Sequence, residues 1–312
     1  MYRRIMVPLD GSSFSESAIP LAVALAHKTG AELRLVHVVI PLTQQVVIGG
    51  EDGADGYLSS LAQRIEEESG VQVVPVTRLG RQAVGELSYY SAEEGVDLIV
   101  MATHGWGGLQ RAWLGSVADG LIREARVPVI AFRPEEESSQ RIDGKSVEQI
   151  IVPLDGSKLS EAVLDEALKL GGEEATYILV RVVPVGPPSS SISGAVELSL
   201  RQELLEELEK GATKYLEGIA ERLRADGYQV RTAVRKDPQP AKAILAEAEA
   251  INADMIAIST HGRAGFARFA LGSVADKVLR GSDTPVMVLR ADQLIDLEEK
   301  ESVGEGQGSA MS

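Results

Sequence analysis

The chain alternates between short, almost wholly apolar runs and longer segments in which apolar residues recur every three or four positions. Continuous apolar runs are typical of strands buried on both faces, and the longer period is typical of amphipathic helices. In the first half of the chain the predicted strands lie at residues 5–9, 33–40, 71–76, 98–101 and 129–132. The predicted helices lie between them at residues 13–28, 57–68, 81–94 and 116–124. This order predicts an α/β fold in which helices cover both faces of a parallel sheet.

The second half of the chain repeats the first half in the same order. The segment from Arg4 to Ser12 matches the segment from Ile150 to Ser157, and residues 126–133 match residues 283–290. A length of 312 residues also fits two domains of ~150 residues each. We therefore predict two tandem doubly wound sheets, each with five parallel strands in the order 3-2-1-4-5.

The predicted first domain spans residues 1–134, a polar linker spans 135–146, and the second domain spans 147–291. Residues 292–312 are expected to form a disordered or solvated acidic tail, because the chain from Ala291 onward holds six acidic residues and one basic residue. The second copy has a longer second helix, and we expect its apolar stripe to cover its own sheet rather than bind a partner. The stripe consists of Leu204, Leu208, Tyr215, Leu216, Ile219 and Leu223.

Charge and composition exclude several classes of function. The formal net charge of −15 argues against binding to nucleic acid, whose phosphates require a basic surface. The chain has no cysteine, so it has neither disulfides nor thiolate metal sites. The first apolar run is too short for a signal peptide, and the apolar stretch around Pro20 is too short to span a membrane. We therefore expect a soluble cytoplasmic protein that binds neither membrane nor nucleic acid.

Dedicated catalytic residues are not evident in the sequence. The chain has no G-x-x-x-x-G-K-[ST] motif, and no local pattern suggests a Ser-His-Asp arrangement. The four histidines are not spaced with carboxylates as metal ligands. Two of them, His104 and His261, occupy equivalent loop positions, where we expect them to orient the loop. The sequence therefore favours a protein that is not an enzyme and has no metal of its own.

Two glycine loops, at residues 105–115 and 262–272, are the most informative repeat. In each loop, nine residues separate the glycine of Thr-His-Gly from a Gly-Ser pair, an apolar run precedes the loop, and a helical pattern follows. The first turn of a helix has unpaired N–H groups, so a glycine-led helix start can bind phosphate. The alternative is an ordinary structural loop in which the serine caps the helix.

The position of the first strand places a carboxylate near each glycine loop. Asp10-Gly11 follows the first strand, and Asp155-Gly156 follows its counterpart in the second half. In open α/β sheets, ligands bind at the carboxyl ends of the strands where the strand order reverses, here between strands one and four. A nucleoside phosphate would suit a carboxylate beside a phosphate-binding loop. The alternative role for Asp10 and Asp155 is to cap the following helix.

Both halves resemble the universal stress protein family, from Tyr2 to Arg290. The ATP-binding members of that family carry the motif G-x2-G-x9-G-[ST], and both copies here depart from it at the first position only. The motif positions in this chain are Ala102, Gly105, Gly115 and Ser116 in the first copy, and Ser259, Gly262, Gly272 and Ser273 in the second. The resemblance implies a Rossmann-like fold of the adenine nucleotide alpha-hydrolase type. It also implies ATP as the cofactor, with ADP or AMP as alternatives and Mg left open.

The resemblance also assigns roles to individual residues. The aspartate of the family maps to Asp10 and Asp155, and its adenine-contacting backbone maps to Val38 and Val182. The phosphates would be held by Gly105, Gly115, Ser116, Gly262, Gly272 and Ser273. Arg263 takes the place of Trp106 in the second copy, and Arg111 and Arg268 are equivalent. Because an arginine near the phosphates strengthens anion binding, we hypothesise tighter ATP binding in the second domain.

The expected function is that of a nucleotide-sensing regulator of the stress response, acting through protein partners that the sequence does not identify. The alternatives are a slow ATPase or phosphotransferase, and a stress scaffold that binds no nucleotide. The fifth strands, at residues 127–132 and 284–289, are apolar edges that invite pairing. In the family, two domains pair through this strand, so we expect an intrachain pseudo-dimer. We also expect two chains to form a homodimer.

Overall fold

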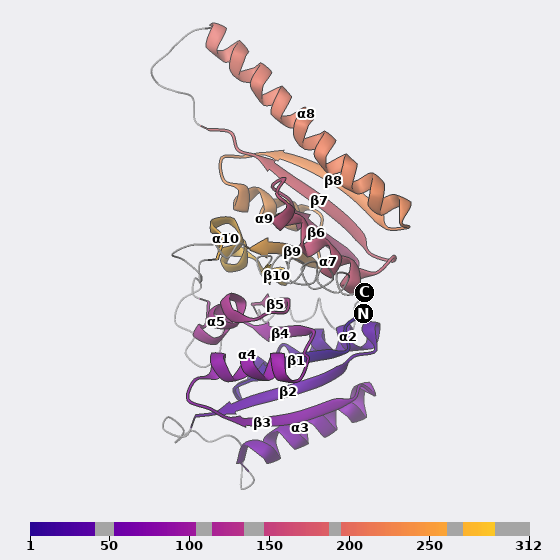
Figure 1. Cartoon of the computed structure of the whole chain (residues 1–312), viewed down its shortest axis with the longest axis vertical. Helices are drawn as coiled ribbons and strands as arrows, with labels where there is room; N and C mark the ends of the chain where they lie inside the picture. Colours follow the sequence, from indigo (N-terminus) through magenta and orange to yellow (C-terminus); the bar gives the residue numbers. More distant parts are fainter. Residues whose placement is uncertain (41–52, 104–113, 134–146, 187–194, 261–270, 291–312) are drawn as a thin grey trace, which may run out of the picture.

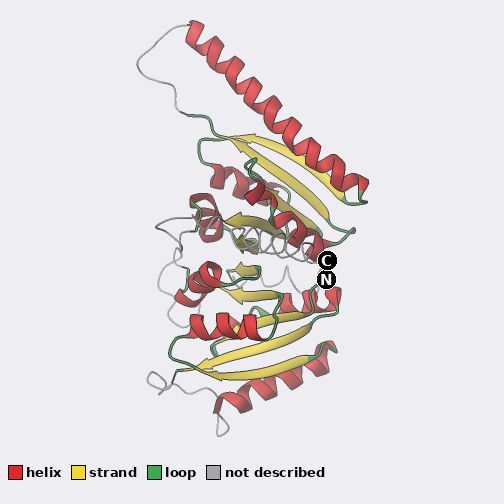
Figure 2. Ribbon diagram, in the orientation of Figure 1, coloured by secondary structure: helices red, strands yellow, loops and turns green. Residues whose placement is uncertain are grey.

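The computed structural model describes residues 1–40, 53–103, 114–133, 147–186, 195–260 and 271–290. Each half of the chain forms a parallel sheet with helices on both sides (Figures 1 and 2). The first half contains β1 (Arg4–Leu9), α1 (Ser13–Glu16), α2 (Ile19–Thr29), β2 (Glu32–Val39), α3 (Gly53–Ser69), β3 (Val73–Leu79), α4 (Ala83–Glu93), β4 (Leu98–Ala102), α5 (Ser116–Glu124) and β5 (Val129–Phe132). The second half contains β6 (Gln149–Pro153), α6 (Lys158–Glu161), α7 (Val163–Gly171), β7 (Thr176–Val183), α8 (Ala195–Ala225), β8 (Gln229–Lys236), α9 (Pro240–Ala250), β9 (Met255–Thr260), α10 (Ser273–Gly281) and β10 (Val286–Arg290).

The predicted strand order is confirmed in both halves, and the two sheets join into one. The order across the ten strands is β3-β2-β1-β4-β5-β10-β9-β6-β7-β8. β5 pairs antiparallel with β10, with Ile130 opposite Met287, while each half is parallel within itself. The fifth strands therefore pair with each other inside the chain, as expected for the pseudo-dimer. The predicted linker at 135–146 and tail at 292–312 lie outside the described residues.

The first predicted helix, at residues 13–28, is in fact two helices. Pro20 lies in the first turn of α2, where its missing N–H costs nothing, but it could not donate to the carbonyl of Glu16 in a continuous helix. The chain therefore ends α1 at Glu16 and starts again at Ile19. Ser12 is the N-cap of α1, and Gly30 ends α2 with a left-handed φ of 72°.

Two apolar layers lie on opposite faces of the sheet, and each runs through both halves. One layer joins residues of α2, α3, α7 and α8 to the sheet, and the other joins residues of α4, α5, α9 and α10 to it. Ile130 and Met287, from the paired edge strands, belong to the first layer, and Val129 and Val288 belong to the second. The edge pairing therefore makes the two predicted domain cores continuous.

The predicted stripe on α8 covers the sheet only in its C-terminal half. Leu216 and Ile219 are buried, and Tyr215 and Leu223 pack against the core. Leu204 and Leu208 do not cover the sheet, since they are 57% and 46% exposed. The prediction was wrong for these two leucines, because the helical period does not reveal how far the helix extends beyond its sheet.

Arginines fasten the two halves together in a pattern with twofold symmetry. Arg133, after β5, donates from Nη2 to the carbonyl of Arg280 at the end of α10, at 2.8 Å. Its counterpart Arg290 donates to the carbonyl of Arg123 at the end of α5. Between these helices, Arg280 also lies 3.8 Å from Asp119 of α5. Each domain thus places a cation at the negative end of a helix in the other domain.

The face that carries α2 and α7 has its own contacts between the halves. The Tyr2 hydroxyl donates to Glu166 Oε2 at 2.8 Å, and Lys28 Nζ donates to the carbonyl of Gly171 at 2.6 Å. Burial, followed by the charge of Glu166, raises the pKa of Tyr2, so its hydroxyl remains a donor. Both faces of the sheet therefore contribute polar contacts to the joint.

No helix in the described part of the chain is both long enough and apolar enough to span a membrane.

The close packing of α7 against the sheet gives a test of the fold. A Cβ at Gly171 would lie 2.8 Å from both Ala175 Cβ and Ile150 Cδ1, and closer still to the Tyr177 hydroxyl. Since Tyr177 is fully buried, Gly171→Ala should lower the free energy of unfolding by about 1–3 kcal/mol, measured in urea. Gly218→Ala in α8 is the control, because no atom lies within 4 Å of its added methyl group. That variant should gain up to about 1 kcal/mol from helix propensity, and equal effects of the two substitutions would contradict the packing argument.

Candidate functional site

A compact turn of polar side chains follows β1. The backbone N–H and the hydroxyl of Ser12 both donate to Asp10 Oδ1, at 3.0 Å and 2.5 Å. Ser12 Oγ in turn accepts from the backbone N–H of Ser15 and caps α1, while Ser15 Oγ accepts from the backbone N–H of Asp10 at 3.2 Å. Gly11, with a φ of 81°, makes the turn possible. Asp10 therefore does not cap the helix itself, and instead it fixes the serine that does.

The second domain repeats this turn after β6. Ser157 donates from its backbone N–H and its hydroxyl to Asp155 Oδ1, at 2.9 Å and 2.6 Å. Ser160 occupies the place of Ser15, and Gly156 has a φ of 90°. The sequence analysis assigned the aspartate and the glycine of this turn to the candidate site, but it did not assign the two serines to it. The repeated Asp-Gly-Ser triplet was the signal that could have identified the first serine.

The hydrogen bonds of this turn favour the charged form of Asp10. Partial burial of Asp10 opposes ionisation, but the bonds donated by Ser12 and Ser15, together with backbone N–H groups, outweigh it. The pKa of Asp10 is therefore lower than its ordinary value of 3.8. Because Asp10 is only partly buried, its ionised carboxylate remains accessible from the protein surface.

The turn lies where the strand order of the sheet reverses. β1 pairs with β2 on one side and β4 on the other, but its pairing with β4 covers only Ile5–Met6 and Leu98–Ile99. β6 and β9 pair over the equivalent two positions, Ile150–Ile151 with Met255–Ile256. The ends of β1 and β4 therefore extend past their shared pairing, at the kind of position where ligands bind in α/β sheets.

Each glycine loop returns to the end of the strand that it leaves. The N–H of Gly115 donates to the carbonyl of Thr103 at 2.7 Å, directly after β4. The N–H of Gly272 donates to the hydroxyl of Thr260 at 3.0 Å, at the end of β9. These bonds hold the starts of α5 and α10 against the carboxyl ends of β4 and β9. The arrangement agrees with the predicted strand, loop and helix.

The starts of α5 and α10 fit an anionic ligand. Gly115 and Gly272 are the N-cap residues, and Ser116 and Ser273 are exposed first residues of the helices. No side chain caps either helix within the described part of the chain. The alternative of a serine N-cap is therefore wrong, because the glycines occupy that position. The first-turn N–H groups of both helices have no side-chain acceptor there, and they suit the oxygens of a phosphate.

Val38 and Val182, the predicted adenine-contacting positions, lie one residue before the ends of β2 and β7. Val38 is 9% exposed, and Val182 is partly exposed. Parallel pairing of β2 with β1, and of β7 with β6, brings both to the edge of the sheet that carries the Asp-Gly-Ser turns. The structure therefore places both valines on the same edge of the sheet as Asp10 and Asp155.

The residue before each valine differs between the two domains. In the first domain, buried His37 lies 2.8 Å from the carbonyl of Leu9, so its Nδ1 carries the proton. In the second domain, Arg181 stacks over the ring of Tyr215, with Cζ 4.8 Å from the ring centroid. Its guanidinium also lies against the turn, since a Cβ on Gly156 would be 2.7 Å from Nη1. At this position a permanent cation therefore supports the second turn, whereas a histidine supports the first.

The first motif position also differs between the domains. Ala102 ends β4, whereas Ser259 lies in β9 and is 8% exposed. The hydroxyl of Ser259 is buried and has no hydrogen-bond partner among the described residues. Burying an unpaired hydroxyl is costly, so a hydrogen-bonding ligand or water would be favourable there. The second site thus has a polar group that the first lacks.

Several predicted residues lie outside the described residues. They are Gly105 and Gly262 of the motif, the arginines Arg111, Arg263 and Arg268, the histidines His104 and His261, and Trp106. The hypothesis of tighter binding by Arg263 therefore stays a prediction.

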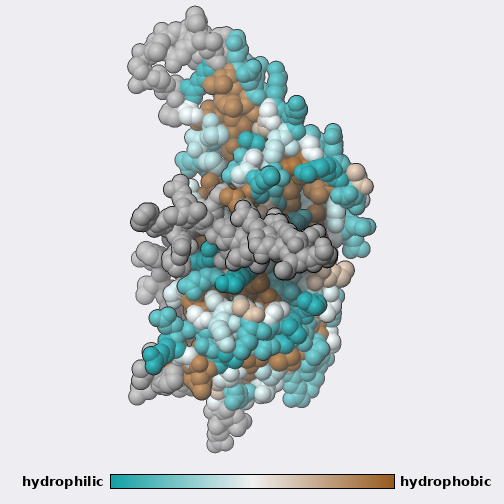
Figure 3. Space-filling view, in the orientation of Figure 1, coloured by the Kyte–Doolittle hydropathy of each residue, from teal (hydrophilic) through white to brown (hydrophobic). Residues whose placement is uncertain are grey.

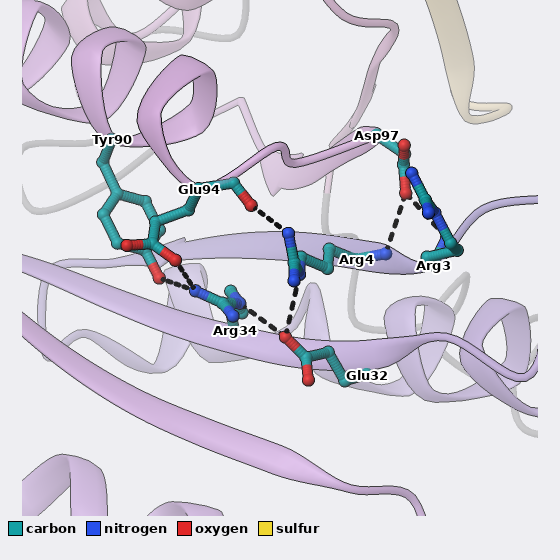
Figure 4. Close-up of polar contacts among 7 residues, drawn as sticks. All are labelled: Arg3, Arg4, Glu32, Arg34, Tyr90, Glu94 and Asp97. Carbon is teal, nitrogen blue, oxygen red and sulfur yellow. Dashed lines mark hydrogen bonds and ion pairs between the residues drawn. The ribbon is translucent and has the colours of Figure 1, made fainter.

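A charged cluster at the amino ends of the strands is structural (Figure 4). Arg34 donates to Glu32 and Glu94, each at 2.7 Å, and to the Tyr90 hydroxyl at 2.9 Å. Asp97 accepts from the backbone N–H groups of Arg3 and Arg4 at the start of β1. Since these residues pair with one another, they join β1 and β2 to the α4–β4 segment.

The same edge of the second domain holds a surface cavity of about 350 Å³. Its lining residues are Glu148, Gln149, Glu174, Thr176 and Arg231. They lie at or near the amino ends of β6, β7 and β8, away from the Asp-Gly-Ser turn and the start of α10. The cavity is therefore not the predicted site. Within the described ranges, no group of three or more histidine or acidic residues could hold a metal ion.

The lowered pKa of Asp10 gives a testable dependence on pH. A group with a lowered pKa in the folded state stabilises the fold above its unfolded pKa, and this contribution is lost as pH falls through the folded pKa. Asp10→Asn keeps the accepting oxygen and removes the charge, so it should lower the free energy of unfolding at pH 7. The difference from wild type should shrink below pH 3.8, measured by denaturant unfolding at each pH. Asp226→Asn is the control, because its exposed carboxylate has no hydrogen bond in the described structure. A difference for Asp10→Asn that is the same at every pH would contradict the argument.

Comparison with known proteins agrees with this fold. The family model described as "Universal stress protein family" matches residues 1–133 and 146–290. A universal stress protein of Mycolicibacterium smegmatis is 26% identical over 307 residues, covering 92% of this chain and 96% of that protein. The crystal structure of a universal stress protein from Archaeoglobus fulgidus aligns with a TM-score of 0.60 and 22% identity, over 92% of this chain and 98% of the other. A universal stress protein solved in complex with cAMP aligns with a TM-score of 0.35 and 21% identity, over 43% of this chain and 98% of the other, which is too distant to identify a ligand here. The family match over both halves shows that this chain belongs to the universal stress protein family.

Proposed function

We propose that the protein is a cytoplasmic, nucleotide-sensing regulator that binds ATP and acts through protein partners. The observation that carries the proposal is the pair of helix starts at Ser116 and Ser273. Each is preceded by a glycine cap, lacks a side-chain cap in the described structure, and is tied to the carboxyl end of the strand beside the Asp-Gly-Ser turn. Two copies of the same arrangement support a binding role more strongly than one copy would.

Different residues of each site would bind the phosphates, the ribose and the base of the nucleotide. The first-turn N–H groups of α5 and α10 would hold the phosphates, with the hydroxyls of Ser116 and Ser273 beside them. Asp10 and Asp155 have Oδ1 engaged by the serine of the turn and would accept hydroxyl hydrogens of the ribose. The backbone of Val38 and Val182 would contact the base. If Mg accompanies the phosphates, the carboxylates of Asp10 and Asp155 are the acidic groups of the turns that would bind it.

The chemistry of Asp10 supports binding rather than turnover. An effective general base has a pKa close to the working pH, whereas the pKa of Asp10 lies below its ordinary value. Such a carboxylate is a good hydrogen-bond acceptor and a weak base. The alternative of slow hydrolysis is tested by following ADP release over time from wild type and from the Asp10→Ala, Asp155→Ala double variant. Steady release that the double variant abolishes would favour an enzyme.

Glycine substitutions at the two caps test the binding sites separately. Gly115 has φ −60° and Gly272 has φ −57°, which alanine adopts without strain, so both variants should fold normally. The added methyl group should hinder the approach of a phosphate, and each variant should weaken ATP binding at its own site about tenfold or more, measured by calorimetry. Because each variant leaves the other site intact, Gly115→Ala should retain the tighter site and lose less overall affinity than Gly272→Ala, and equal losses of overall affinity would count against tighter binding in the second domain.

The identity of the ligand is tested on the protein as purified. Nucleotide released by denaturation and identified by mass should be ATP, ADP or AMP. If no nucleotide is released and calorimetry with ATP gives no heat, the protein is a nucleotide-free scaffold and the proposal fails.

A further inference from the structure

Helix α8 is much longer than the strands that it covers. At ~1.5 Å per residue its 31 residues extend for about 46 Å, whereas the eight residues of β8 extend for about 26 Å. In the first domain, the 17 residues of α3 extend for about 26 Å, close to the length of β3. The N-terminal half of α8 therefore projects past the sheet, as Figure 1 shows at the top of the molecule.

The projecting half of α8 exposes an apolar row. The stripe that faces the sheet continues through Ala212, Leu216 and Ile219, all buried. Leu204 and Leu208 lie to one side of this stripe, one helical turn apart, and are 57% and 46% exposed. Exposed Gly211 continues the row with a spacing of three residues. Figure 3 shows apolar surface on this upper part of the molecule.

The row has the spacing of a seam between two helices. Positions separated by four and then three residues stay on one face of a helix, as the core positions of a coiled coil do. Gly211 has no neighbouring atom within 4 Å of a Cβ position, so the backbone of another helix could approach closely there. The geometry therefore suits an α-helix packed against Leu204, Leu208 and Gly211.

The charges beside this row indicate which helix binds to it. Glu207 and Lys214 flank the row on the side away from the sheet, seven residues apart and therefore on the same line of the helix. Both are exposed, and neither has an ion pair among the described residues. The row thus carries a negative charge toward its N-terminal end and a positive charge toward its C-terminal end.

This charge pattern is complementary to itself in one orientation. If two copies of α8 pair antiparallel, with the axis of symmetry between Leu208 and Gly211, Glu207 of each copy faces Lys214 of the partner subunit. In a parallel pair, Glu207 and Lys214 would instead face Ala212 and Ile219 of the partner subunit, which are apolar and buried and offer no opposite charge. A twofold contact forms two equal ion pairs and places Leu208 of each copy next to the axis, against Gly211 of the partner subunit.

We propose that the projecting half of α8 is a dimer surface, which binds α8 of a second copy of this chain in an antiparallel pair. The other route to a dimer, through the edge of the fifth strand, is closed because β5 and β10 already pair within the chain. The α8 contact leaves both nucleotide sites intact, and it does not depend on nucleotide binding.

The mass of the protein in solution tests the proposal. Light scattering after gel filtration of the full chain should give twice the 33.3 kDa mass of one chain at high concentration. The Leu204→Glu, Leu208→Glu variant should give one chain at the same concentration, with its helix content unchanged by circular dichroism because glutamate favours helices. Leu79→Glu, at a leucine that is 71% exposed on β3, is the matched control and should remain a dimer.

Charge reversal tests the orientation of the pair. Glu207→Lys and Lys214→Glu should each raise the dissociation constant of the dimer about tenfold, because each places like charges together. The double variant Glu207→Lys, Lys214→Glu should restore the wild-type constant. A wild-type chain that stays monomeric, a dimer that survives the two leucine substitutions, or a double variant as weak as the single ones would overturn the proposal.

Discussion

The antiparallel pairing of β5 with β10 is the contact on which the rest of the structure depends. Without it, two five-stranded sheets would each expose an apolar edge strand, with its unpaired backbone groups open to other chains. With it, Val129 to Ala131 lie opposite Val286 to Val288, and both apolar layers run across the joint. The arginines that reach between the halves then bond to the carbonyls of Arg123 and Arg280. Duplication thus gives one continuous sheet rather than two separate domains.

The same two helices serve both the joint and the candidate sites. The C-terminal ends of α5 and α10 lie at the joint, where each accepts a hydrogen bond from an arginine of the other domain. Their N-terminal ends, at Ser116 and Ser273, have no side-chain cap among the described residues. A helix dipole is stabilised by a cation at one end and by an anion at the other. The arginines of the other domain meet the first requirement, and the proposed phosphate would meet the second.

The two halves share the same strand order and the same turn after the first strand, and they differ in the elements around that turn. The turns after β1 and β6 match bond for bond, yet His37 supports one and Arg181 supports the other. Similarly, α3 matches its sheet in length, whereas α8 projects past its own. The two copies thus share the aspartate, glycine and serines that form the turn, and they differ in the residue beside the turn and in the length of the helix that covers the outer strands. The second domain is therefore where this chain departs most from a symmetric pair.

The sequence by itself determined the strand order, because short apolar runs alternating with amphipathic helices allow few arrangements of a parallel sheet. It also located Asp10, Asp155, Gly115 and Gly272, since turns and helix starts depend on local residue types. Only the tertiary structure decided what these residues do. Asp10 fixes Ser12 rather than capping the helix, Gly115 takes the cap position expected for Ser116, and Pro20 divides one predicted helix into two. Exposure of Leu204 and Leu208 was likewise decided by the length of the sheet beneath α8, because periodicity records which face of a helix is apolar and not where its support ends.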